Sequence, residues 1–218
     1  AAALGPPLDG AADGSLTAHM AQHLLLGLAA PALLALAAPV RLALAALPSG
    51  GRRAVGRALH HPLVRAAARP AAAVPLAAAV TAGVHAPGAV DLALRHDAVH
   101  VLEHGALFWS GLLLWMSVLA VDPLPAAPGP VARLAWLMLL MTAMSVVGAA
   151  YASAGRVLVG AYAQRPGALA DQQAAGALMW VGGAALLVPV ILAVVFAALL
   201  GEEERQRRRE AAQAGGRG

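Results

Sequence analysis

The sequence predicts an all-α protein, a polytopic transmembrane bundle of about five membrane-spanning helices. Of the 218 residues, 60% are hydrophobic and only 12% are charged, and the mean hydropathy is +0.71. A soluble domain carries about 25% charged residues. The apolar residues gather in runs, and a run of about 20 such residues is long enough to cross a bilayer as a helix. The protein therefore works in or beside the membrane, and a large soluble catalytic domain is excluded.

Five apolar runs account for the expected spans. They are Thr17 to Ala38, Ala71 to His85, Ala98 to Val121, Ala132 to Ser153 and Leu169 to Leu200. The second run is the weakest predictor, because it is largely alanine, which inserts only marginally by itself. The fifth run exceeds the length that a span needs, so one end must project, or the helix must tilt or kink at Pro189.

The polar segments set the domain limits. The proline-rich stretch Pro123 to Pro130 predicts a short loop, because proline lacks a backbone donor and resists helix formation. Residues 1–200 form one predicted transmembrane domain. Residues 201–218 form a charged tail, expected to be a frayed helix that continues into disorder.

The distribution of arginine predicts the orientation. All fifteen basic residues are arginine, and they flank apolar runs, so the pI of about 10.9 does not indicate a nucleic-acid partner. If the amino terminus is outside, twelve arginines lie in cytoplasmic segments and three on the outer side. Cytoplasmic loops are enriched in arginine and lysine. We therefore expect the amino terminus of this chain outside and the tail in the cytoplasm.

In that topology, six of the eight histidines fall at the outer side: His19, His23, His85, His96, His100 and His104. His19 and His23 are four residues apart and share one helix face, and the last three histidines form a stripe on another helix. Ionisable groups at this depth face the bundle interior, a partner or a water-filled cavity. Imidazoles from three helices at one level favour a metal or cofactor site. A structural hydrogen-bond network and a proton path are the alternatives.

The chain has no cysteine, which excludes disulfides and thiolate metal sites. Imidazole suits copper, zinc, iron and nickel, and a pair of transmembrane histidines can also bind haem. Met20 is a candidate soft ligand for Cu(I), and the other five methionines are expected to pack. Glu103, Asp171 and Gln172 lie at the same level as the histidines. They are expected to fix the histidine tautomers, and the two carboxylates could also bind the metal directly.

One short motif suggests a different chemistry. His100, Glu103 and His104 fit H-x-x-E-H, the zinc-protease pattern in which two histidines bind zinc and the glutamate activates water. A membrane protease also needs a third ligand and a cleft that admits a peptide. No segment of the sequence offers an edge for a substrate strand or an obvious gate, and a five-residue match is weak evidence by itself.

Four ordered segments carry a resemblance to a known family. His19 to Leu26, His85 to Pro87, Leu94 to His104 and Leu169 to Trp180 resemble successive signatures of the CtaG-type cytochrome c oxidase assembly family of bacterial membrane proteins. The resemblance implies a non-enzymatic chaperone of the plasma membrane that binds copper and delivers it to haem-copper oxidase. Its implied partners are oxidase subunits, an unidentified copper donor and the lipid bilayer.

The chain departs from the family pattern at two places. The family usually has an aromatic residue before the histidine at position 85, where this chain has Val84. The family is also usually longer at its amino end, with one or two further spans, and Ala1 to Pro7 resembles the end of such a helix.

The resulting hypothesis places His19, His23, His85, His100 and His104 around a metal, suspected to be copper, near the outer interface. His96 lies on the preceding loop and is expected to receive the metal first. The competing hypothesis is a non-metal scaffold for oxidase subunits, in which the same polar groups bond only to one another.

Overall fold

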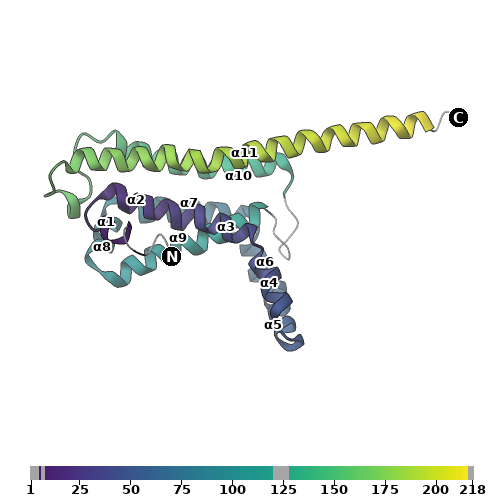
Figure 1. The fold of residues 1–218 in the computed structure, drawn as a ribbon, viewed down its shortest axis with the longest axis horizontal. Helices are drawn as coiled ribbons and strands as arrows, with labels where there is room; N and C mark the ends of the chain where they lie inside the picture. The colour runs from purple at the N-terminus through teal and green to yellow at the C-terminus, as the bar shows by residue number, and fades with distance from the viewer. Residues whose placement is uncertain (1–4, 6–7, 120–127, 216–218) are drawn as a thin grey trace.

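The computed structural model describes residues 5, 8–119 and 128–215, and all of its regular elements in those residues are helices. In chain order they are α1 (Leu8–Ala12), α2 (Leu16–Leu24), the π-helical turn η2 (Leu25–Ala29), α3 (Ala30–Leu36), α4 (Pro39–Ala46), α5 (Ser49–His60), α6 (Pro62–Ala67), α7 (Pro70–Val84), α8 (Pro87–Arg95), α9 (Asp97–Leu119), α10 (Pro130–Ala152), the 3₁₀ turn η3 (Gly160–Tyr162) and α11 (Ala168–Gly215). The long helices lie side by side in one bundle (Figure 1).

The predicted all-α bundle is confirmed. Within the described residues, four continuous helical segments are long and apolar enough to span a membrane: Leu16–Leu36, Asp97–Leu119, Pro130–Ala152 and Ala168–Gln213. The pair α7 and α8 makes a fifth if it is counted as one span, and it bends by 71° at the break that contains His85. Residues 120–127 lie outside the described residues, and with them the predicted end of the third span at Val121 and most of the loop Pro123 to Pro130.

Two connecting segments are more helical than the sequence predicts. The arginine-rich connection after the first span contains α4, α5 and α6, and the connection between His85 and His96 contains α8. Pro39, Pro62 and Pro87 each stand in the first turn of one of these helices, where a fixed φ favours the helix and no donor is lost.

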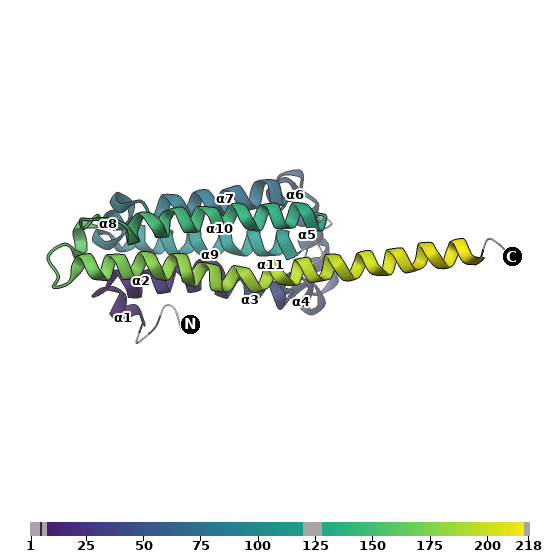
Figure 2. The ribbon, with the colours of Figure 1, turned by 90° about the horizontal axis from the view of Figure 1, so that it is seen from above.

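The fifth apolar run is longer than a span needs, and the structure accommodates the extra length in a helix that projects from the bundle. α11 continues through Pro189 to Gly215 and projects from the bundle (Figures 1 and 2). The projecting part carries ion pairs one helical turn apart, such as Arg205 with Glu202 and Arg208 with Glu204, which support an isolated helix. Because α11 crosses position 200 without a break, a domain boundary there stays a prediction.

A π-helical turn in the first span allows α9 to pack closely. Pro31 has no N–H for the carbonyl of Gly27, four residues earlier, which favours the wider turn. The Gly27 carbonyl oxygen contacts the position that a Cβ of Gly111 would occupy, so only glycine fits there. Trp115 donates a hydrogen bond of 2.9 Å from Nε1 to the Leu28 carbonyl oxygen. The contact fixes α9, which carries three of the predicted site residues, against the first span.

α10 and α11 also approach each other through glycine. A Cβ on Gly148 would lie 2.8 Å from the carbonyl oxygen of Gly176, and a Cβ on Gly176 would meet the backbone of α10 even more closely. Small residues at helix interfaces let backbones approach within a membrane, where packing rather than the hydrophobic effect drives association.

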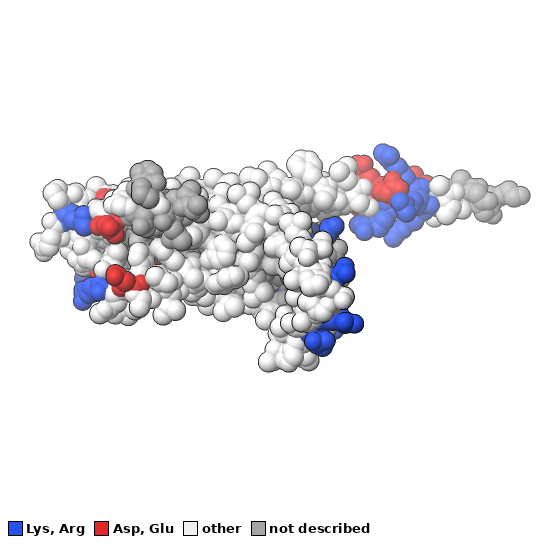
Figure 3. All heavy atoms as spheres, turned by 60° about the horizontal axis from the view of Figure 1, so that its bottom comes forward, with Lys and Arg blue, Asp and Glu red and all other residues white. Residues whose placement is uncertain are grey.

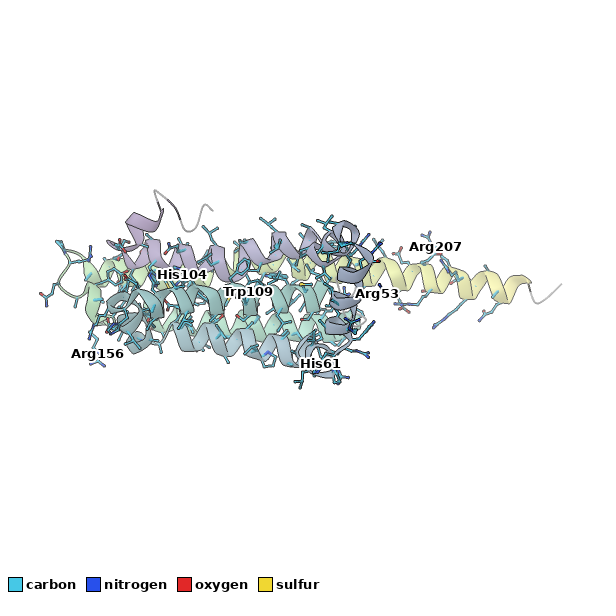
Figure 4. The ribbon with its side chains drawn as sticks, turned by 90° about the horizontal axis from the view of Figure 1, so that it is seen from below. Arg53, His61, His104, Trp109, Arg156 and Arg207 are labelled. Carbon is cyan, nitrogen blue, oxygen red and sulfur yellow. The ribbon has the colours of Figure 1, made fainter. Side chains whose placement is uncertain are left out.

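Charged side chains gather at the two ends of the bundle and in the tail, with a broad uncharged zone between them (Figure 3). His104 lies toward the end that carries Arg156, whereas Arg53 and His61 lie at the opposite end (Figure 4). The helix arrangement therefore places the six predicted histidines at one end of the bundle and the arginine-rich segment at the other.

Replacing Gly176 with alanine is expected to destabilise the bundle by about 1–3 kcal/mol, the usual scale for overpacking a closely packed site. Thermal unfolding of the detergent-purified chain measures the loss. Gly83→Ala is the matched control, because nothing lies within 4 Å of a Cβ at that helical position. Equal stability of the two variants would contradict the close contact.

Candidate metal centre

α2 places two histidines in the bundle interior. His19 and His23 are separated by one helical turn, and their ring centroids are 4.2 Å apart. Both side chains are buried, with 0% and 2% of their surface exposed. Ser15 caps α2 by accepting from the Ala18 N–H. The i, i+4 spacing therefore puts both imidazoles on the buried face, as the sequence predicts.

α9 presents three groups to the same place. The His100 and His104 rings are 4.2 Å apart, and Glu103 is buried between these two turns. The His100 ring stacks on His19 at 5.4 Å with 20° between the planes. The His104 ring meets His23 edge-on at 5.3 Å. Four imidazoles from two helices thus form one continuous cluster.

Glu103 joins two sets of potential ligand atoms. One set consists of His19, His100 and Glu103, and the other of His23, Glu103 and His104, with the ligand atoms of each set within 4.8 Å of one another. The His23 Nε2 and Glu103 Oε2 atoms are 3.7 Å apart. We call these five residues, His19, His23, His100, Glu103 and His104, the histidine cluster.

A chain of hydrogen bonds sets the tautomer of His23. The Thr81 carbonyl can only accept, so the 2.7 Å contact makes His85 Nδ1 the donor. In the neutral ring, His85 Nε2 then accepts from His23 Nδ1 at 3.1 Å. This leaves a lone pair on His23 Nε2, the atom that faces Glu103. Tyr151 donates to the His85 carbonyl oxygen at 2.7 Å and ties the α7–α8 break to α10.

Several atoms of the cluster fit a metal ion because they are buried and make no hydrogen bond within the described part of the chain. They are Nδ1 and Nε2 of His19, Nε2 of His23, Nε2 of His100 and Oε2 of Glu103. Buried polar atoms are nearly always hydrogen-bonded in proteins. Nitrogen and carboxylate oxygen are also the ligand types that first-row transition metals accept.

An apolar cavity adjoins the cluster and is lined by residues that include His23, His85, Leu107, Ser110 and Met144. The cavity has a volume of about 30 Å³, which is room for one or two water molecules. This space is too small for a peptide segment. This cavity therefore does not provide the peptide-binding cleft that a zinc protease built on His100, Glu103 and His104 would need.

The other predicted site residues lie outside the two sets of ligand atoms. His85 supports His23, as described above. His96 ends α8 and is exposed, which suits its expected place on the outer loop. Met20 is buried in an apolar cluster with Leu16 and Val90.

Asp171 and Gln172, at the start of α11, have structural partners. Both carboxylate oxygens of Asp171 accept hydrogen bonds from the first turn of α2, including 2.6 Å from the Leu16 N–H. Gln172 accepts from the Leu158 N–H and donates to the Arg156 carbonyl oxygen. Asp171 therefore holds α2 to α11, and Gln172 holds the α10–α11 connection, so both position the helices around the cluster.

Sequence reasoning missed three supporting residues. Thr81 acts through its carbonyl, which every residue type has, so no side-chain signal could reveal it. Tyr151 is an aromatic residue in an apolar run and looks like packing. Asp91 accepts from the Gly160 and Ala161 N–H groups, and its acidic side chain in the segment after His85 was the one available signal.

With this geometry established, the comparison with protein families is decisive. Residues 1–200 match the family model of the cytochrome c oxidase caa3 assembly factor. The chain belongs to this family. The family resemblance predicted from the four ordered segments is confirmed, and the protein is a membrane-embedded assembly factor for cytochrome c oxidase. Neither the curated proteins nor the solved structures gave a match.

The variant Asp171→Ala tests whether Asp171 holds the start of α2, as its hydrogen bonds indicate, or binds a metal ion. We expect it to lower the free energy of unfolding by about 1–2 kcal/mol, the scale for losing a helix cap, and to change metal affinity less than twofold. Thermal unfolding and metal titration of the same detergent-purified sample give both values. A tenfold loss of affinity with unchanged stability would make Asp171 a ligand instead.

Proposed function

We propose that this assembly factor binds copper in the histidine cluster and passes it to an oxidase subunit during assembly. The observation that carries the proposal is the convergence of four imidazoles and the Glu103 carboxylate at one end of the bundle. Ligand atoms of His19, His23, His100 and Glu103 are buried there and make no hydrogen bond among the described residues. The copper is cargo, received from a donor and released to the oxidase.

Charge balance favours copper(I) over a divalent ion. A ligating carboxylate is deprotonated and ligating histidines are neutral, so the cluster supplies one negative charge through Glu103. A monovalent ion makes the buried assembly neutral. A divalent ion would leave one positive charge in surroundings that are mostly apolar, which is costly without a further partner.

The structure offers a short route between the cluster and the aqueous phase. His96 is exposed at the junction of α8 and α9, four residues before His100 and eight before His104. His100 and His104 lie on successive turns of α9, about 5.4 Å apart along its axis, and His96 is the extended residue directly before the first turn of α9. A carrier must exchange its metal, so a line of ligands from the surface to a buried cluster suits delivery better than a closed structural site does.

The hydrogen bond that His23 donates to His85 supports the same function. Metal-binding histidines usually donate their second ring N–H to a fixed acceptor, which sets the tautomer and the ring orientation. His85 supplies that acceptor, and the Thr81 carbonyl holds His85.

We expect His23→Ala to reduce the affinity for copper(I) at least tenfold, because it removes a ligand and its support. Competition with a colorimetric copper(I) chelator, using the full chain in mild detergent, measures the affinity. His60→Ala is the control, because His60 is exposed in α5 at the opposite end of the bundle.

His96→Ala in the same assay should retain most of the equilibrium affinity and slow copper transfer to the chelator. If His23→Ala and the unchanged protein bind copper equally, or if the unchanged protein binds none, the non-metal scaffold is the correct function. If His96→Ala loses affinity as completely as His23→Ala, His96 is a ligand of the same site.

Delivery outside the cytoplasm requires the cluster to face the outer side. In this cysteine-free chain, Gly88→Cys at the cluster end should react with a membrane-impermeant thiol reagent added to intact cells, and Gly50→Cys in α5 should not. Both positions are exposed, so burial does not explain a difference. The reverse labelling would place the cluster in the cytoplasm and contradict outward delivery.

A further inference from the structure

The basic segment, residues 39–69, contains α4, α5 and α6 and connects the first span to α7. None of the residues in these three helices is buried. The segment leaves the bundle sideways, across its long axis (Figure 1). Its turn away from α3 is made at Ala38, which adopts the left-handed conformation with φ of 51°. Because both ends continue into membrane-spanning helices, the segment must lie at a membrane surface.

The segment carries only positive charge. It has six arginines and two histidines but no aspartate or glutamate. The ion pairs found in the described part of the chain lie in the tail and in the histidine cluster, so the arginines of the basic segment are not neutralised by carboxylates there. A row of unpaired arginines at a membrane surface is a site for anionic groups.

α5 separates most of its charged residues from its apolar residues. At about 100° per residue, Arg53, Arg57 and His60 fall within about 60° of one another. Ala54, Val55, Ala58 and Leu59 occupy the other side of the helix. Arg52 lies at the edge of that apolar side, about 20° from Leu59, and its long side chain can extend to the headgroups. In an amphipathic helix this division permits the apolar side to enter the lipid while the charged side remains at the headgroups.

The neighbouring helices extend the apolar side. Leu42 in α4 is 62% exposed, and Leu63 in α6 is 74% exposed. The charged side chains gather along the edge of the segment that faces away from the bundle (Figure 3). The side nearer the membrane zone is therefore uncharged, and the side nearer the aqueous phase is basic.

We propose that the basic segment lies on the membrane leaflet from which α3 and α7 emerge, with Leu42, Leu63 and the apolar side of α5 in the lipid and its arginines bound to anionic phospholipid headgroups. Charge complementarity and the attachment of both ends to spans select the lipid as the occupant. The inference does not depend on copper binding, since the segment and the histidine cluster lie at opposite ends of the bundle.

Spin labels at two single cysteines test where the segment lies. In vesicles of phosphatidylcholine and phosphatidylglycerol, a label at Leu63→Cys should collide with dissolved oxygen and be protected from a water-soluble nickel chelate. A label at His60→Cys, on the charged side of α5, should be accessible to the chelate. Equal, high accessibility of both labels to the chelate would overturn the proposal, because the segment would then extend into water.

Lipid selectivity tests the headgroup contacts. The variant Arg53→Gln/Arg57→Gln/Arg65→Gln should reduce the preference for spin-labelled phosphatidylglycerol over phosphatidylcholine at least fivefold. A factor of about five is the effect expected from the loss of a single arginine contact with an anionic headgroup. The control variant Arg205→Gln/Arg207→Gln/Arg208→Gln removes the same charge from the tail. Its effect should be less than twofold, because those arginines already pair with glutamates.

An unchanged preference in the first variant, or an equal loss in both, would refute headgroup binding by the basic segment. Protection of the Leu63→Cys label in the full chain without any lipid preference would also refute it, and would indicate a protein partner on this surface.

Discussion

The structure depends on the placement of four imidazoles and one carboxylate between α2 and α9, where His19, His23 and Glu103 are buried and His100 and His104 are half-buried. Such groups are costly in an apolar interior unless they have partners, and several of their atoms make no hydrogen bond among the described residues. A metal ion would satisfy them together. A core with no such requirement would be more stable with apolar side chains at these five positions, so the cluster is best understood as a site whose ligand completes it.

The rest of the bundle holds that cluster in place. Gly111 lets α9 approach the first span closely, which brings His100 and His104 to His19 and His23. Asp171 fixes the first turn of α2 from α11, and Tyr151 fixes the break after α7 from α10. Each of these contacts joins helices that are distant in sequence, so the positions of the imidazoles are set by all five predicted spans rather than by one helix.

Much of the fold and part of the site could be predicted from the sequence. Apolar run length predicts the spans, and the i, i+4 spacing predicts that His19 and His23, and likewise His100 and His104, share a helix face. The roles of His85 and Asp171 could not be predicted, because they depend on which helices are neighbours and on how each side chain is rotated. Both residues have the chemistry of a ligand, and only the structure shows that they bond to His23 and to the start of α2.

The helices of the basic segment were missed for a different reason. Prolines at positions 48 and 62 and the glycine pair at 50 and 51 are typical of loops, and the lengths of α4, α5 and α6 are marginal for isolated helices in water. A membrane surface changes that balance, because an amphipathic helix gains apolar burial there. The arginines of this segment predict orientation from the sequence alone, whereas their place on one side of a helix becomes apparent only once the helices are known.

X-ray absorption spectroscopy of the copper(I)-loaded full chain tests the central claim most directly, because it reports the ligand atoms themselves. The account predicts bound copper with the multiple-scattering pattern of two or more imidazoles, a light-atom ligand shell and no sulfur neighbour. A sulfur neighbour would instead assign Met20 or another methionine as a ligand. Absence of imidazole scattering, or failure to retain copper at all, would contradict the account and leave the cluster as a structural network.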